Sequence, residues 1–416
     1  MQLTIDDEFA RRMAVFGGFE TEPHLAVAVS GGADSIALCL LANTWAEARG
    51  GKVIALTIDH GIREESLREA RQVGEILKPY NIKHLILTWN NPKPTSAIQE
   101  SARFARYDLL LSWCKDNGIL HLLTGHHQGD QLETLLFRRD RESGPDGLAG
   151  MAAFVETPFA RILRPFEGFT KKKITNYLKL INQPWIEDPS NEDPKYTRNI
   201  LRRSLALMSE AARYEILQDA QKAAEARAGF ENSTNQNLPH IATLHPLGCI
   251  TLDKQGLLDC PKHIAVRILR RALGNAGTRH YPARQKEAER LYEMCLPENT
   301  LPRTTSSGCV IRSTKTSLEF TPETANLEDA TLTGAITPWG QYFVTSNDLL
   351  KGANLTKITP KILQGFEASV RETVLKDLPP DLKVALPCII SPDSPPTIPK
   401  QITWHPRKPL APLPVL

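Results

Sequence analysis

Short apolar runs alternate with longer amphipathic stretches over the first third of the chain. The runs 25–29, 53–58 and 119–123 are apolar at nearly every position, and 84–89 is a weaker fourth. Strands this apolar are buried on both faces, and their alternation with helices predicts an α/β fold with a parallel, doubly wound sheet. Ligands on such sheets bind where the strands end and the connecting loops begin.

The pattern changes after this region. Residues 210–227 are predicted to be helical, and the polar, breaker-rich segment 232–237 is predicted to be a linker. We therefore expect three domains: a catalytic domain over 1–210, a mainly helical domain over 211–330, and a small α+β domain over 331–416. Eleven of the 30 prolines fall in the last 38 residues, which favours extended strands and turns at that end.

Composition indicates the cellular compartment in which the protein works. The seven cysteines are scattered, and no pair has the spacing of a metal or redox motif, so they are predicted to be buried thiols in a reducing compartment. No segment has the roughly 20 apolar residues of a membrane span, and the acidic start of the chain is unlike a signal peptide. We expect a cytoplasmic protein without a membrane partner.

Charge is unevenly distributed. The net charge is +3, but residues 161–203 hold ten Lys and Arg against five Asp and Glu, and residues 261–290 hold eight against two. Two basic patches of this kind indicate a polyanion partner, although ordinary solvated surfaces are the alternative.

The strongest motif is the segment Ser30-Gly31-Gly32-Ala33-Asp34-Ser35, which lies between the first apolar run and a helical stretch. Glycines permit a tight turn and close approach of the backbone, and the N–H groups of a helix start bind anions. Asp34 would repel phosphate unless a Mg²⁺ lay between them. An ordinary strand-to-helix turn is the alternative.

This segment resembles the pyrophosphate loop of the ATP pyrophosphatases, which have the adenine nucleotide alpha hydrolase-like fold. Two better known phosphate-binding loops, the P-loop and the dinucleotide-binding loop, are excluded, because the chain has neither a Gly-x-x-x-x-Gly-Lys-Ser/Thr nor a Gly-x-Gly-x-x-Gly motif. The resemblance implies that ATP is cleaved between its α- and β-phosphates.

A second motif, residues 124–134, ends a strand and opens a helix. Asp130 and Glu133 are three residues apart and share one helical face, where they could hold Mg²⁺ or an amine. They could instead complement the helix dipole. The adjacent His126 and His127 are more typical of packing and capping than of ligand binding.

Two further segments are rich in arginine. Residues 141–151 form a glycine-rich loop after Arg138 and Arg139, and we expect this loop to be mobile and to close over substrate. The segment 187–191 precedes Arg198 and Arg202, which could steady phosphate charge.

Together these motifs resemble the tRNA(Ile)-lysidine synthases, as do Ser101–Tyr107 and Asp59-His60-Gly61 after the second strand. The resemblance implies that the first anticodon cytidine of a CAU-anticodon tRNA(Ile) is adenylated by ATP, and that the ε-amine of lysine then displaces AMP. Glu142 stands where that family usually has glycine, which puts the closing conformation of the loop in question.

The resemblance also implies residue roles. Asp34, Asp130 and Glu133 would be catalytic; Asp34 would bind Mg²⁺, and Asp130 with Glu133 would bind lysine. ATP would be bound by Ser30, Gly31, Gly32, Ala33, Asp34, Ser35, Asp59, His60 and Arg198. The tRNA would be bound by Arg138, Arg139, Arg141 and Arg202.

The predicted helix 264–273 has one apolar side and one side bearing Arg267, Arg270 and Arg271. With no acid beside them, these arginines are predicted to be exposed and to contact tRNA phosphates, with simple solubility as the alternative. Trp339 and Trp404 could stack on bases, but burial at strand positions is the favoured interpretation.

Three alternatives to lysidine synthesis remain at this stage: a tRNA thiolase, a non-catalytic RNA-binding protein, and a small-molecule synthetase. The thiolase is disfavoured by the lack of paired cysteines. The oligomeric state is open, with a homodimer as one alternative.

Overall fold

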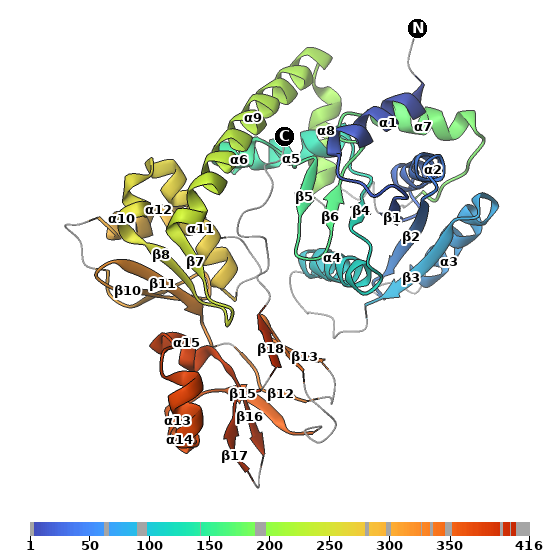
Figure 1. Cartoon of the computed structure of the whole chain (residues 1–416). Coiled ribbons are helices and arrows are strands. Elements are labelled where there is room, and N and C mark those ends of the chain that lie inside the picture. The colour runs from blue at the N-terminus through green and yellow to red at the C-terminus, as the bar shows by residue number, and fades with distance from the viewer. Residues whose placement is uncertain are drawn as a thin grey trace. The chain divides into compact units, whose positions relative to one another are not determined.

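The computed structural model divides the chain into two compact units, and the boundary between them in the sequence falls after Gly229, within one helix. It describes residues 4–61, 66–89, 98–141, 143–187, 197–278, 283–296, 301–325, 327–332, 336–345, 352–391, 394–399 and 401–404. Each unit has its own β-sheet structure and its own apolar core (Figure 1).

The first unit is built on a six-stranded sheet with the order β3-β2-β1-β4-β6-β5. Its strands are β1 (His24–Ala28), β2 (Lys52–Asp59), β3 (Lys83–Thr88), β4 (His121–Leu123), β5 (Phe154–Glu156) and β6 (Arg161–Leu163). All neighbouring pairs are parallel except β5 and β6. The doubly wound, mostly parallel sheet is therefore confirmed, with an antiparallel edge strand that the sequence pattern did not indicate.

Helices cover both faces of this sheet (Figure 1). The helices α1 (Ile5–Phe16), α2 (Ala33–Glu47), α3 (Ser66–Leu77) and α7 (Lys171–Leu180) share one apolar core, and α4 (Ile98–Asp116) packs in the other. The unit also contains α5 (Gln128–Asp140), α6 (Pro145–Leu148), α8 (Thr197–Leu207) and the short helix Lys78–Tyr80. In α1 the cap is Thr4, and Phe9, Met13 and Phe16 recur on the buried side.

The second unit begins within α9 (Glu210–Ile241) and contains three antiparallel sheets. The first has the order β7-β8-β11-β10-β9, the second β12-β15-β16-β17 and the third β13-β14-β18. Its strands are β7 (Ala242–Leu244), β8 (Ile250–Asp253), β9 (Thr304–Ser306), β10 (Cys309–Ser313), β11 (Ser317–Pro322), β12 (Ala330–Thr331), β13 (Ile336–Trp339), β14 (Tyr342–Thr345), β15 (Asn354–Lys357), β16 (Pro387–Ser391), β17 (Ser394–Thr397) and β18 (Gln401–Trp404). Its further helices are α10 (Lys254–Asp259), α11 (Lys262–Ala276), α12 (Gln285–Met294), α13 (Pro360–Gly365), α14 (Ala368–Val370) and α15 (Pro380–Ala385), with a short π-helix at Arg371–Leu375.

The second unit bears on three of the expectations from the sequence. The segment 232–237 is not a linker, because α9 continues through it and buries Leu238 and Ile241 beyond it. Side-chain packing on the C-terminal part of α9 outweighs the weak helix propensity of Asn and Ser there. Trp339 and Trp404 are buried at strand positions, as favoured from the sequence. The division into three domains stays a prediction.

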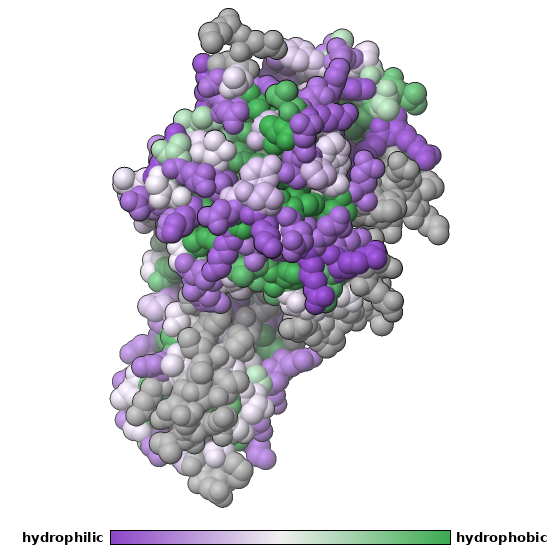
Figure 2. Space-filling model, turned by 90° about the vertical axis from the view of Figure 1, so that its right-hand side faces the viewer, coloured by the Kyte–Doolittle hydropathy of each residue, from purple (hydrophilic) through white to green (hydrophobic). Residues whose placement is uncertain are grey.

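The face of the molecule in Figure 2 is mainly hydrophilic. On the face drawn in Figure 2 hydrophilic side chains predominate, and apolar ones gather in smaller patches among them. Across the described ranges, the structure contains no helix with the length and apolar character to cross a membrane.

Candidate active site

The segment Ser30–Ser35 joins β1 to α2, as predicted, and is held by hydrogen bonds within itself. The hydroxyl of Ser35 accepts from the backbone N–H of Ser30 at 3.1 Å and donates to the carbonyl of Gly32 at 2.9 Å. Gly32 is the N-cap of α2, so the first N–H groups of the helix, which have no intrahelical acceptor, face the loop. The segment is therefore a preformed anion site at a helix start.

Two glycines are closely packed around this loop. Gly31 has φ +91°, and a Cβ there would lie 2.7 Å from Cδ1 of Ile186. A Cβ on Gly125, in the loop after β4, would lie 3.2 Å from the backbone of Asp34. The turns after β1 and β4 thus converge at one edge of the sheet, as expected for parallel strands.

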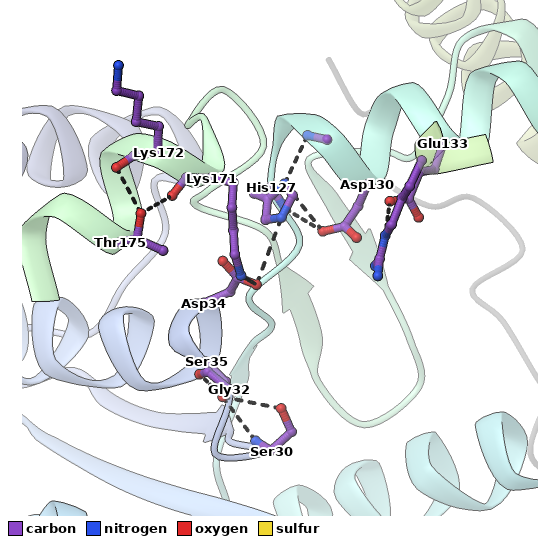
Figure 3. Close-up of polar contacts among 12 residues, drawn as sticks. Ser30, Gly32, Asp34, Ser35, His127, Asp130, Glu133, Lys171, Lys172 and Thr175 are labelled. Atoms are coloured by element: carbon purple, nitrogen blue, oxygen red, sulfur yellow. Dashed lines mark hydrogen bonds and ion pairs between the residues drawn. The ribbon is translucent and has the colours of Figure 1, made fainter. Parts of the chain in front are cut away.

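Asp34 is the central side chain of this edge (Figure 3). Its Oδ2 lies 2.6 Å from Nζ of Lys171 on α7 and 3.8 Å from Nε2 of His127. Its Oδ1 is buried and has no hydrogen-bond partner in the part of the chain that the structure describes. One carboxylate oxygen is therefore neutralised by a lysine, and the other is left without a hydrogen-bond partner among the described residues.

His127 joins Asp34 to Asp130. It is the N-cap of α5, where Nδ1 accepts from the N–H of Gly129 at 2.9 Å, so the ring proton of the neutral imidazole lies on Nε2 and faces Asp34. Asp130 completes the cap by accepting from the N–H of His127 at 2.9 Å. The capping interpretation is thus confirmed for His127, and Asp130 takes part in the same capping box.

Glu133 lies one turn further along α5 and is buried. Its Oε1 accepts from Nε of Arg202 on α8 at 2.6 Å, and the arginine side chain is 42% exposed. Arg202, predicted to bind tRNA, therefore lies beside the carboxylate predicted to bind lysine.

His126 is kept neutral by its surroundings. Burial, followed by the nearby Arg164 guanidinium, lowers the pKa of the His126 imidazole to about 3. Its Nδ1 lies 3.0 Å from the hydroxyl of Thr124, which orients the ring. An uncharged His126 is suited to packing and hydrogen bonding and does not add a cation to the site.

The other residues predicted to bind ATP are Asp59, His60 and Arg198, and their role stays a prediction. Asp59 and His60 lie at the end of β2, where Asp59 accepts from the N–H of Gly61 at 2.9 Å and from the hydroxyl of Ser66 at 2.7 Å. The ring of His60 meets that of Trp89 edge-on at 6.2 Å. Arg198 lies in the first turn of α8, but its side chain is outside the described part of the structure, and so is the whole of Glu142.

The glycine-rich loop is held to α5 through Arg138. Its Nη1 donates to the carbonyls of Gly147 and Gly150 at 2.9 and 2.8 Å, while Gln131 forms two hydrogen bonds with the backbone of Met151. In the described residues 143–151 these hydrogen bonds attach the loop to α5, and its mobility and closure over substrate stay predictions. Arg139 and Arg141 are exposed, and Arg141 lies 4.3 Å over the ring of Phe137.

The arginines of α11 are not the exposed, unneutralised group that was predicted. Arg267 and Arg271 both bind Glu231 of α9, the former at 2.6 Å, and each arginine side chain is only 11% exposed. Arg270 donates to the carbonyl of Ala283 at 3.3 Å. The continuation of α9 brings Glu231 against α11, which is why the prediction from the α11 sequence alone was wrong about exposure; their contact with tRNA stays a prediction.

The donor set at Asp34 suits a metal ion that arrives with phosphate. Among the residues that the structure describes, no three His, Cys, Asp or Glu side chains are placed together to hold a metal. Mg²⁺ commonly takes one or two carboxylates and completes its shell with water and substrate phosphates. The buried, unpartnered Oδ1 of Asp34 fits that arrangement.

One site residue was not identified from the sequence. Nothing in the local pattern around Lys171 connects it to Asp34, 137 positions away. The only available signal was its position in the first turn of a helix, where a cation is unfavourable.

Comparison with known proteins agrees with this geometry. A family model described as a PP-loop domain matches residues 5–209, which include the whole phosphate loop and α5. The site at Ser30–Ser35 is therefore the ATP-binding loop of a PP-loop protein.

Relatives named tRNA(Ile)-lysidine synthase match most of the chain. The one from Wolbachia pipientis wMel is 34% identical over 315 residues, which are 74% of this chain and 72% of the relative. The one from Methylobacterium nodulans is 33% identical over 336 residues, covering 76% of this chain and 95% of the relative. With the motifs in place around one loop, the chain belongs to the tRNA(Ile)-lysidine synthase family.

Proposed function

We propose that this protein is a cytoplasmic ATP-dependent ligase that converts the first anticodon cytidine of a CAU-anticodon tRNA(Ile) to lysidine. The observation that carries the proposal is the preformed phosphate loop, with Asp34 at its centre, in a chain of this family. The reaction joins lysine to the base and releases AMP and pyrophosphate. The modified base then pairs with A instead of G, so the tRNA reads AUA.

In the first step, O2 of the cytidine attacks the α-phosphate of ATP, and pyrophosphate leaves. The loop 30–35 supports this step, because N–H groups and hydroxyls at a helix start stabilise the charge that accumulates on the leaving group. Mg²⁺ bound with ATP would supply further charge neutralisation at Oδ1 of Asp34, the oxygen that has no partner among the described residues.

In the second step, the ε-amine of lysine attacks C2 of the cytidine and AMP leaves. The amine must lose its proton first, since an ammonium group is not a nucleophile. We assign lysine binding to Asp130 and Glu133, one turn apart on α5. Glu133 is the stronger candidate of the two, because Asp130 also caps its own helix, whereas the partner of Glu133 is a side chain from another helix.

The tRNA is proposed to bind through exposed cations of the first unit. Arg139 and Arg141 are exposed, and Arg202 is partly so at the edge of the lysine site. These suit phosphate contacts better than Arg267 and Arg271, which are largely buried against Glu231. A homodimer remains one alternative for the assembly.

The proposal is tested by incubating the protein with ATP, labelled lysine and an unmodified CAU-anticodon tRNA(Ile) transcript. We expect label in acid-precipitable RNA that depends on ATP and is lost when guanosine replaces the first anticodon cytidine. Asp34→Ala should abolish incorporation, while Asp116→Ala, at an exposed position at the end of α4, should retain it.

The contrary outcome is equally clear. A folded protein that releases AMP in the presence of the transcript, but transfers no lysine to it, would retain the adenylation step and exclude lysine as the nucleophile. Equal lysine incorporation by the Asp34→Ala and wild-type proteins would show that Asp34 and its loop are not needed for the reaction.

A further inference from the structure

Lys171 reaches the phosphate loop from a different part of the fold. It lies in the first turn of α7, which packs on α2 in the same apolar core, and its ammonium is 2.6 Å from Oδ2 of Asp34. In Figure 3 the Lys171 side chain extends to Asp34, whereas the neighbouring Lys172 points away from it. The ammonium is thus placed at the anion site by tertiary packing.

Stability does not account for this placement. A cation in the first turn of a helix opposes the helix dipole, and the α7 first turn contains no acid to offset it. The Lys171 side chain is 51% exposed, and ion pairs this exposed contribute little to folding. A long, exposed lysine in an unfavourable helix position is better explained by a ligand that it binds.

The surroundings indicate the charge of that ligand. Asp34 alone would repel an anion approaching the N–H groups at the start of α2, and Lys171 neutralises the carboxylate on one oxygen. The other oxygen is buried and has no partner among the described residues. A polyphosphate that brought Mg²⁺ would use that oxygen through the metal and would leave the ammonium within reach of its own oxygens.

We infer that Lys171 is a phosphate-binding residue that pairs with Asp34 in the nucleotide-free protein and binds the pyrophosphate portion of ATP in the complex. This rests on the proposed function for the identity of the nucleotide. Lysine suits the role because its ammonium is a compact charge on a flexible stem, which can move by a few ångströms without displacing α7.

Nucleotide binding measured by calorimetry tests this role without relying on turnover. With Mg²⁺ present, we expect Lys171→Ala to weaken binding of ATP and of pyrophosphate by about tenfold, the loss expected for one charge-assisted contact. AMP lacks the β- and γ-phosphates, so its affinity should stay within about twofold of wild type. Lys171→Arg should recover part of the loss, because it restores the charge.

Lys172→Ala is the matched control, since it removes an exposed lysine from the same helix turn without touching Asp34. It should bind ATP, pyrophosphate and AMP as the wild type does. Circular dichroism of each variant checks that α7 is retained.

Two results would overturn the inference. Unchanged ATP and pyrophosphate affinities in Lys171→Ala would show that the lysine does not bind phosphate. Equal weakening for AMP and ATP would assign it a purely structural effect. Either result leaves lysidine synthesis intact, whereas a normal ATP response without lysine transfer would contradict the proposed function and leave the role of Lys171 standing.

Discussion

Adjacent glycines in the phosphate loop differ in what they require of the backbone. Gly31 has φ +91°, a conformation that other residues rarely adopt, and a Cβ there would meet Ile186 at 2.7 Å and Val73 at 3.1 Å. Gly32 has φ −68°, and the nearest atom to a Cβ would be the Ser30 hydroxyl at 3.8 Å. The motif contains two adjacent glycines, but backbone conformation and packing require glycine only at Gly31.

Alanine substitution should therefore separate the two positions. We expect Gly31→Ala to lower the free energy of unfolding by about 2 kcal/mol, through backbone strain and the displacement of Ile186. Gly32→Ala should change it by less than about 1 kcal/mol, since alanine fits there and is only a poorer N-cap. Urea unfolding followed by tryptophan fluorescence measures both; similar losses in the two variants would contradict the explanation.

At the scale of elements, α5 organises the candidate site through side chains on several of its sides. Its N-terminal residues meet Asp34 through His127, Glu133 binds Arg202 of α8, and Arg138 binds two carbonyls of the glycine-rich loop. The loop is therefore positioned by the same helix that carries the proposed lysine site. Weakening the attachment should therefore increase local opening of the loop more than it disturbs the sheet.

Removing Arg138 tests this attachment. Arg138→Ala should destabilise the fold by about 2 kcal/mol, because two carbonyls lose a charged donor. It should also speed cleavage of the loop by thermolysin, a protease that does not require arginine. The neighbouring Arg139→Ala is exposed and should match wild type in both measurements. A loop that is cleaved equally in all three proteins would show that Arg138 does not hold it.

At the scale of the whole molecule, the seven cysteines report on both units. All seven are buried and free, which confirms the prediction of buried thiols. Burial raises the pKa of the Cys114 thiol to about 12 and that of Cys249, Cys295 and Cys388 to about 11, and it raises the pKa of Cys39, Cys260 and Cys309 as well. The nucleophilic thiolate is therefore scarce throughout the folded chain near neutral pH.

Thiol titration checks this expectation. At pH 8, Ellman's reagent should react with less than about one thiol per folded chain within minutes, since low thiolate content and burial both slow the attack. In guanidinium chloride all seven should react. Rapid reaction of one or more thiols in the native protein would identify a segment that opens easily.

The sequence alone was sufficient for the features that contiguous residues decide. The apolar runs predicted β1 to β4, the turn chemistry of 30–35 predicted the phosphate loop, and the motifs around it indicated the family. These predictions succeeded because strand burial, loop conformation and helix starts depend on residues a few positions apart.

Only the tertiary structure decided which charged side chains meet. Lys171 pairs with Asp34 across 137 positions, and Arg202 with Glu133 across 69. Arg267 is neutralised by Glu231, which is brought against α11 because α9 continues beyond the helix expected over 210–227. An ion pair depends on which helices pack together, and that arrangement is a property of the whole core that no local pattern contains.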